Sequence, residues 1–122
     1  MPPHAPALNR DYLRELYGDD PELVAIMFEA FLEETLPQWN TLGGWLDANE
    51  LARFGEVAHQ VKPAFSMVGL TDLHAPIQEL ERIARYQPDA GRLRRLFVET
   101  DARVQLVQPL IEEELHRLRQ PI

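Results

Sequence analysis

The sequence predicts an all-α protein, an antiparallel four-helix bundle with one or two short accessory helices. Apolar residues recur at spacings of three and four along most of the chain rather than at two, which is typical of amphipathic helices and not of strands. The connections between the apolar stretches are short and polar, and helices joined in this way pack as antiparallel neighbours. These two observations together indicate a bundle.

Composition excludes several classes of protein. With 122 residues, 45% of them hydrophobic, the chain fits one domain with a modest core and not a large multidomain enzyme. A net charge of −8 argues against nucleic acid, which selects a concentrated basic surface. Without cysteine there is neither a disulfide framework nor a thiolate metal site, and no apolar run is long enough for a signal peptide or a membrane span. We therefore expect a cytoplasmic protein with no nucleic-acid or membrane partner.

Caps and prolines divide the chain into segments. The first seven residues, MPPHAPA, hold three prolines and little that could be buried, so we expect a disordered tail at 1–7 and one helical domain at 8–119. A short first helix is expected to start from Asn9 or Asp11 and to end at Gly18, and a second should run from Pro21 to about Glu34. Thr35 and Pro37 restart or kink the chain, and the next helix has an apolar face from Leu36 to Leu46. The remaining helices are expected over about 50–68, from Leu73 to Ala84, and from Leu93 to Leu118 with a kink at Pro109.

The helix at 50–68 carries a row of small and polar residues. Its apolar residues continue in phase past Pro63, which predicts an unbroken helix. At about 100° per residue, His59 points roughly 130° and Lys62 roughly 70° from the centre of the apolar stripe, toward the same flank. Gly55 and Ser66 extend this row at both ends. The row offers an exposed imidazole, which is a nucleophile when neutral, a cation one turn away, and clearance for another protein.

The segment AHQVKPAFSMVGL, at 58–70, resembles the signature of the histidine-containing phosphotransfer (HPt) domain, A-H-x-L-K-G followed by small residues and L-G. Ala58, His59, Lys62 and Gly69 stand where the family has its alanine, phosphorylated histidine, lysine and second glycine. The flanks LYGDDPELVAIMFEAFLEET and LHAPIQELERIAR are similar to the neighbouring helices of the family, so that the resemblance covers about residues 8–118. It implies a phosphorelay carrier that accepts a phosphoryl group from the aspartyl phosphate of a response-regulator receiver domain and passes it to another receiver, with a hybrid histidine kinase as a further candidate partner.

The resemblance also implies roles for individual residues. His59 would be the phosphorylated nucleophile, and Lys62 would offset the charge on the phosphoryl oxygens. The receiver would bring its own divalent metal, so this chain would need no cofactor and would have no kinase activity of its own. The family's glycine after the lysine is Pro63 here, which removes one helical hydrogen bond at a typical cost of ~3 kcal/mol and projects within roughly 40° of His59. The expected partner-binding residues are Gly55, Pro63, Ser66 and Gly69.

An adaptor is the first alternative. Pro63 beside His59 is compatible with a bundle that binds receivers without efficient transfer. Arg82 and Arg85 of the following helix could steer a phosphate, although a solvated charged face is the simpler interpretation.

A metal-binding bundle is the second alternative. Glu56 with His59 and Glu113 with His116 are Glu-x-x-His pairs on two helices, a spacing that di-iron carboxylate bundles use. Such ligands must point inward. Glu56 instead points roughly 170° from the apolar stripe of its helix, and Glu113 and His116 point more than about 100° from theirs. No metal site is therefore expected.

Overall fold

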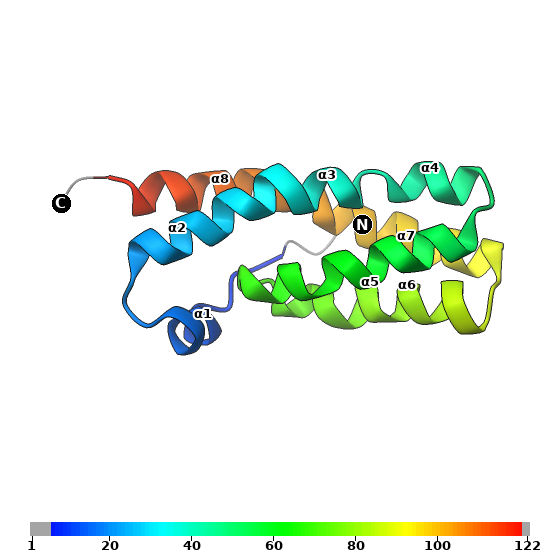
Figure 1. Ribbon diagram of the computed structural model, residues 1–122, viewed down its shortest axis with the longest axis horizontal. Helices are drawn as coiled ribbons and strands as arrows, with labels where there is room; N and C mark the ends of the chain where they lie inside the picture. Colours follow the sequence, from blue (N-terminus) through cyan, green and yellow to red (C-terminus); the bar gives the residue numbers. More distant parts are fainter. Residues whose placement is uncertain (1–5, 121–122) are drawn as a thin grey trace.

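The computed structural model describes residues 6–120, which form an elongated helical bundle that contains no strand (Figure 1). Most of the expected tail at 1–7 lies outside the described residues and stays a prediction. Within residues 6–120, no helix is both long and apolar enough to cross a membrane. The elements are α1 (Arg10–Tyr17), α2 (Pro21–Ala30), the π-helical turn η1 (Phe31–Thr35), α3 (Leu36–Trp39), α4 (Leu42–Asp47), α5 (Leu51–Met67), the 3-10 turn η2 (Thr71–Leu73), α6 (His74–Tyr86), α7 (Ala90–Val104) and α8 (Val107–Leu118).

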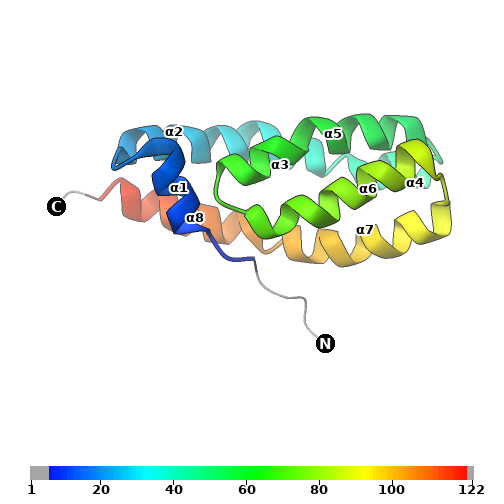
Figure 2. The same ribbon diagram turned by 90° about the horizontal axis from the view of Figure 1, so that it is seen from below.

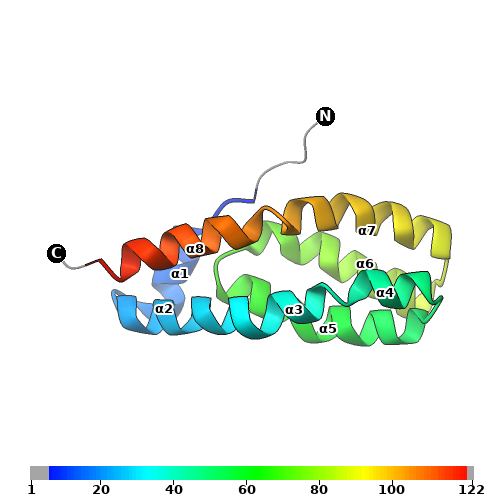
Figure 3. The ribbon, with the colours of Figure 1, turned by 90° about the horizontal axis from the view of Figure 1, so that it is seen from above.

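Four rods of helix run side by side in alternating directions. The first rod consists of α2, η1, α3 and α4, the second of α5, the third of α6, and the fourth of α7 followed by α8 (Figures 1 and 3). α5 packs most extensively against α6, and α2 packs against α8. α1 lies across one end of the bundle, where it contacts α2 (Figure 2). The predicted all-α fold is confirmed.

Two helix starts follow the caps that the sequence predicted. The side chain of Asn9 accepts a hydrogen bond from the backbone N–H of Tyr12 at 3.0 Å, and that of Asp20 accepts one from Leu23 at 3.1 Å. Gly18 ends α1 with a φ of 64°, a left-handed conformation that glycine adopts without a steric penalty. Local chemistry is sufficient to set these boundaries.

The first rod passes Pro37 without a break. The backbone N–H of Leu36 donates to the carbonyl of Phe31, five residues earlier, which defines the π-helical turn. Pro37 has no N–H to offer the carbonyl of Glu33, and a π turn is one way for a helix to absorb such a lost bond. The expected restart at this point is therefore a local widening. The helix is interrupted only after α3, and α4 then continues the rod.

The last predicted helix is two helices. α7 ends at Val104 and α8 begins at Val107. In a continuous helix the ring of Pro109 would press on the carbonyl of Gln105. The break instead places Pro109 in the first turn of α8, where a backbone N–H has no helical partner in any case. The predicted kink is thus a break just before the proline.

Aromatic rings fill the core beside α5. Phe65 lies edge-on to Phe31 and to Trp39, with ring centroids 5.0 and 5.6 Å apart, and Phe97 continues the cluster to Phe54 at 5.6 Å. Burying each such ring contributes about 2–3 kcal/mol, so the cluster fixes the rotation of α5 about its axis. The apolar spacing of this helix predicts a buried stripe of Leu51, Phe54, Ala58, Val61, Phe65 and Val68. All of these are buried except Leu51, which is half-buried.

Candidate functional site

α5 carries His59 and runs through Pro63 as one helix, as predicted. Pro63 itself is exposed. Beyond it, Phe65 and Val68 have exposed fractions of 0% and 1%. Burial of two such side chains stabilises this segment by about 3–6 kcal/mol, which offsets the ~3 kcal/mol cost of an interior proline. Tertiary packing therefore keeps the helix intact after the proline.

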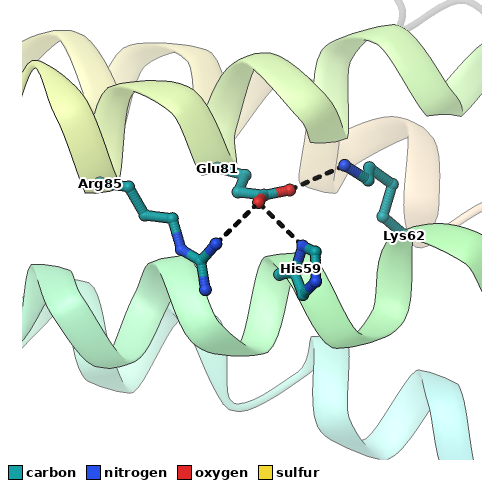
Figure 4. A network of polar contacts seen from close by, with 4 residues as sticks. All are labelled: His59, Lys62, Glu81 and Arg85. Carbon is teal, nitrogen blue, oxygen red and sulfur yellow. Dashed lines mark hydrogen bonds and ion pairs between the residues drawn. The ribbon is translucent and has the colours of Figure 1, made fainter.

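The imidazole of His59 is exposed on one side and held on the other. Its side chain is 57% exposed, and Nδ1 lies 2.9 Å from Oε2 of Glu81 (Figure 4). A carboxylate only accepts hydrogen bonds, so Nδ1 carries the proton in this pair. Nε2 then keeps its lone pair, which is the state that a nucleophile requires.

Glu81 of α6 is the functional residue missing from the predicted site. Its carboxylate lies between three donors: Lys62 Nζ at 2.8 Å on Oε1, and His59 together with Arg85, at 3.2 Å, on Oε2 (Figure 4). The Glu81 side chain is only 11% exposed. Burial raises the pKa of Glu81, but the hydrogen bonds from Lys62 and His59 outweigh burial and leave this pKa below its ordinary value. The carboxylate is therefore charged at neutral pH.

The position of Glu81 in the sequence contains a signal for this role. It follows Ile77 by four residues and precedes Ala84 by three, which places it in the apolar stripe of α6. A carboxylate in such a stripe needs cationic or hydrogen-bonding partners from a neighbouring helix. Its spacing therefore marks Glu81 as a buried carboxylate that needs partners, although the spacing does not say which helix supplies them.

Positive charge exceeds negative charge around the ring. Lys62 and Arg85, with side chains 19% and 32% exposed, outweigh the single carboxylate of Glu81 by one charge when His59 is neutral. Partly buried charges act more strongly than fully hydrated ones. The arrangement therefore favours an anionic group arriving at Nε2.

Two of the expected partner-binding residues lie on the open face. Pro63 is exposed and Ser66 is half-buried, and both project within roughly 40° of His59 around α5. They remain candidates for contact with a partner.

The two glycines of that set are buried, which corrects the expectation that they lie open to a partner. A Cβ on Gly55 would lie 2.8 Å from Cγ of Arg85, and one on Gly69 would lie 2.9 Å from the side chain of Leu13. Gly69 also has a φ of +84°, which L side chains rarely adopt. These glycines allow α6 and α1 to approach α5 closely.

The residues of the metal-binding alternative do not meet. Glu56 pairs with Arg53 of its own helix at 3.4 Å, and the ring of His116 lies 2.8 Å from the side chain of Gln120. Glu113 is exposed. In the part of the chain that the structure describes, no three His, Asp or Glu side chains are grouped so that they could hold a metal ion.

Comparison with known families identifies the family of this chain. A family model, the Hpt domain, matches residues 26–121, which include His59 on α5 and Glu81 on α6. α1 and the start of α2 precede the matched region. Comparisons with curated proteins and with solved structures gave no match. The chain therefore belongs to the Hpt domain family, and its general role is histidine phosphotransfer in two-component signalling.

Proposed function

We propose that this protein is a phosphorelay carrier that accepts a phosphoryl group on Nε2 of His59 from the aspartyl phosphate of one receiver domain and passes it to another. The observation that supports the proposal most directly is the 2.9 Å contact of Nδ1 with Glu81, which leaves Nε2 unprotonated on the exposed side of the ring. We propose that it acts in the cytoplasm.

The chemistry uses side chains of α5 and α6. The lone pair of Nε2 attacks phosphorus, and the N–P bond forms while the P–O bond to the aspartate of the receiver breaks and the aspartate leaves as a carboxylate. The ring of His59 gains positive charge in this step, and the Nδ1–H bond to Glu81 stabilises it. Lys62, one turn from His59, offsets charge on the phosphoryl oxygens. The reverse sequence delivers the group to the next receiver, and the receiver supplies the divalent metal.

We expect the receiver to dock on the face of α5 around His59. Pro63 and Ser66 adjoin His59, and Met67 follows with 42% of its surface exposed. α1 meets this end of α5, where the hydroxyl of Tyr17 donates a 2.7 Å hydrogen bond to the carbonyl of Met67. Leu16 of α1 is 43% exposed. Large apolar side chains exposed near a reactive histidine suit the apolar centre of a transient interface. Receiver domains are the proposed partners, and a hybrid histidine kinase is a further candidate.

An adaptor that binds receivers without efficient transfer is the second candidate. It is favoured by one observation, the exposed ring of Pro63 at the position where the family signature has glycine. The two candidates share the docking face and differ only in whether a phosphohistidine forms.

Incubation of the purified protein with phosphorylated receiver domains tests both candidates. Transfer should give a label that is acid-labile and base-stable, absent in His59→Gln and retained in His116→Gln, a matched change of an exposed histidine on α8. Binding without label would support the adaptor. Neither binding nor label with any receiver would contradict both.

A further inference from the structure

Gly55 lies one helical turn before His59 and contacts Arg85 of α6. A Cβ at this position would lie 2.8 Å from Cγ of Arg85, 3.5 Å from Cβ of Ala84 and 3.6 Å from Nε of Arg85. The first distance is shorter than real Cβ contacts show, so a side chain here would force Arg85 to move. Glycine weakens a helix interior, which makes the presence of Gly55 inside α5 informative. The stem of Arg85 occupies the volume that a side chain at this position would fill.

From this position Arg85 reaches the site. Its guanidinium donates to Oε2 of Glu81 at 3.2 Å, the same oxygen that lies 2.9 Å from Nδ1 of His59. Lys62 occupies the other oxygen at 2.8 Å. Figure 4 shows Arg85 and Lys62 on opposite sides of the carboxylate, with His59 between them. Arg85 therefore fixes the oxygen that sets the tautomer of His59, while Lys62 holds the oxygen that does not touch the ring.

We propose that Gly55 is a positioning residue: because it has no side chain, Arg85 can lie across α5 and keep Oε2 of Glu81 against Nδ1 of His59 while Lys62 turns to the phosphoryl group. The inference rests on the proposed function of His59. When Lys62 leaves Oε1, the largely buried carboxylate still has a cationic partner in Arg85, so it does not become an uncompensated buried charge. Gly55 thus acts on the ring through Arg85 and Glu81 and not by contact with a partner.

A double-mutant cycle tests this coupling. We expect Gly55→Ala and Arg85→Ala each to slow phosphoryl transfer from a phosphorylated receiver to His59 about tenfold, the typical effect of losing one hydrogen bond to a charged group. The double variant should be no slower than Arg85→Ala alone, because that change removes the Cγ that Gly55 accommodates. The control is Gly44→Ala, the same change in α4 at a place where a Cβ meets nothing within 4 Å, and it should transfer at the wild-type rate. Multiplying effects in the double variant would overturn the proposal.

A second readout does not depend on transfer. Nitrogen-15 NMR of the imidazole should show His59 protonated mainly at Nδ1 in the wild type and in Gly44→Ala, with a larger Nε2-protonated fraction in Gly55→Ala and in Arg85→Ala. A merely structural role of Gly55 would not move this ratio, so an unchanged ratio in folded Gly55→Ala sinks the proposal. Should Gly55→Ala not fold, Arg85→Ala, which leaves α5 untouched, must still shift the ratio. If the wild type takes no label, the proposed function fails, and the tautomer comparison still decides the role of Gly55.

Discussion

Replacing Glu81 by glutamine should block Nε2 of His59, the proposed nucleophile. The amide keeps the shape of the carboxylate but has only one accepting oxygen, whereas Glu81 accepts on both: from Lys62 on Oε1, and from His59 and Arg85 on Oε2. Lys62 and Arg85 can both only donate, but the Lys62 bond is the shortest of the three at 2.8 Å, and its side chain is the least exposed at 19%. The amide oxygen should therefore face Lys62 and the amide NH₂ should face Nδ1. Nδ1 must then accept, and the ring proton moves to Nε2.

The size of the effect follows from the three contacts. Charge-assisted hydrogen bonds contribute about 1.5–3 kcal/mol each, but His59 and Arg85 are 57% and 32% exposed, so solvent screens their share. Lys62 keeps a neutral acceptor. We expect the free energy of unfolding to fall by about 2 kcal/mol and Tm by about 8 °C for a chain of this size. Loss of the free Nε2 should slow transfer about 100-fold.

The stability difference should depend on pH. Burial raises the pKa of Glu81, but the hydrogen bonds from Lys62 and His59 outweigh burial and hold this pKa below its ordinary value. A carboxyl with a lowered folded-state pKa stabilises the protein fully above the unfolded value and loses this contribution as the pH falls through the folded value. Thermal unfolding of the wild type and of Glu81→Gln should therefore differ at neutral pH and converge below the folded-state pKa.

Transfer kinetics, imidazole NMR and thermal unfolding of Glu81→Gln, each compared with a matched control, test these expectations. The control is Glu79→Gln, because Glu79 lies on the same helix and pairs with Arg82 and Arg92 instead of the ring of His59. It should leave transfer and tautomer unchanged. A Glu81→Gln protein that transfers at the wild-type rate with Nδ1 still protonated would refute the reasoning, as would an equal loss of transfer in Glu79→Gln.

Three other substitutions test separate parts of the molecule. Pro63→Gly should speed transfer and raise the free energy of unfolding by up to about 2 kcal/mol. Proline costs about 3 and glycine about 1 kcal/mol relative to alanine in a helix interior. Unchanged receiver binding and transfer would show that Pro63 does not crowd the site. Glu114→Gln should loosen α1, because two hydrogen bonds from Arg10, at 2.8 and 3.0 Å, attach α1 to Glu114 of α8 and lower the pKa of Glu114. Hydrogen exchange of the backbone amides of α1 should rise about tenfold at neutral pH in this variant. The wild type should show the same loosening only as the pH falls below the lowered pKa of Glu114. Met67→Glu should weaken receiver binding about tenfold in calorimetry, because it places a charge in the apolar contact. The control is Val98→Glu on α7, where the wild-type valine is 58% exposed, and it should leave receiver binding unchanged. An equal loss of binding in both variants would argue against docking at Met67.

Local features of the fold were predictable and long-range ones were not. The caps at Asn9 and Asp20 act within three residues of their partners, so the sequence contains all of their chemistry. The outcomes at Pro37 and Pro109 differ although both residues are prolines within an apolar helical pattern. A proline identifies which hydrogen bond is lost, but the pattern does not say whether the chain widens into a π turn or breaks.

The same distinction explains the site. His59 and Lys62 lie on one helix, and their spacing alone places them on one flank. Glu81 joins them only because α6 packs against α5 in a particular register. The spacing that places Gly55 in the row of His59 and Lys62 led to the expectation of an open surface. A helical wheel gives a direction and not a neighbour, and Arg85 covers this flank.

Pro63 and Glu81 affect different properties of the same histidine. Pro63 changes the backbone of α5 at the carbonyl of His59 and the space beside the ring, whereas the protonation of the ring is set from α6 by Glu81 with Arg85. The loss of one backbone hydrogen bond in α5 is tolerable for the chemistry because the hydrogen bond at Nδ1 comes from another helix. The proline should therefore tune which receivers reach Nε2 and how fast they do so, while the tautomer that makes Nε2 a nucleophile is preserved.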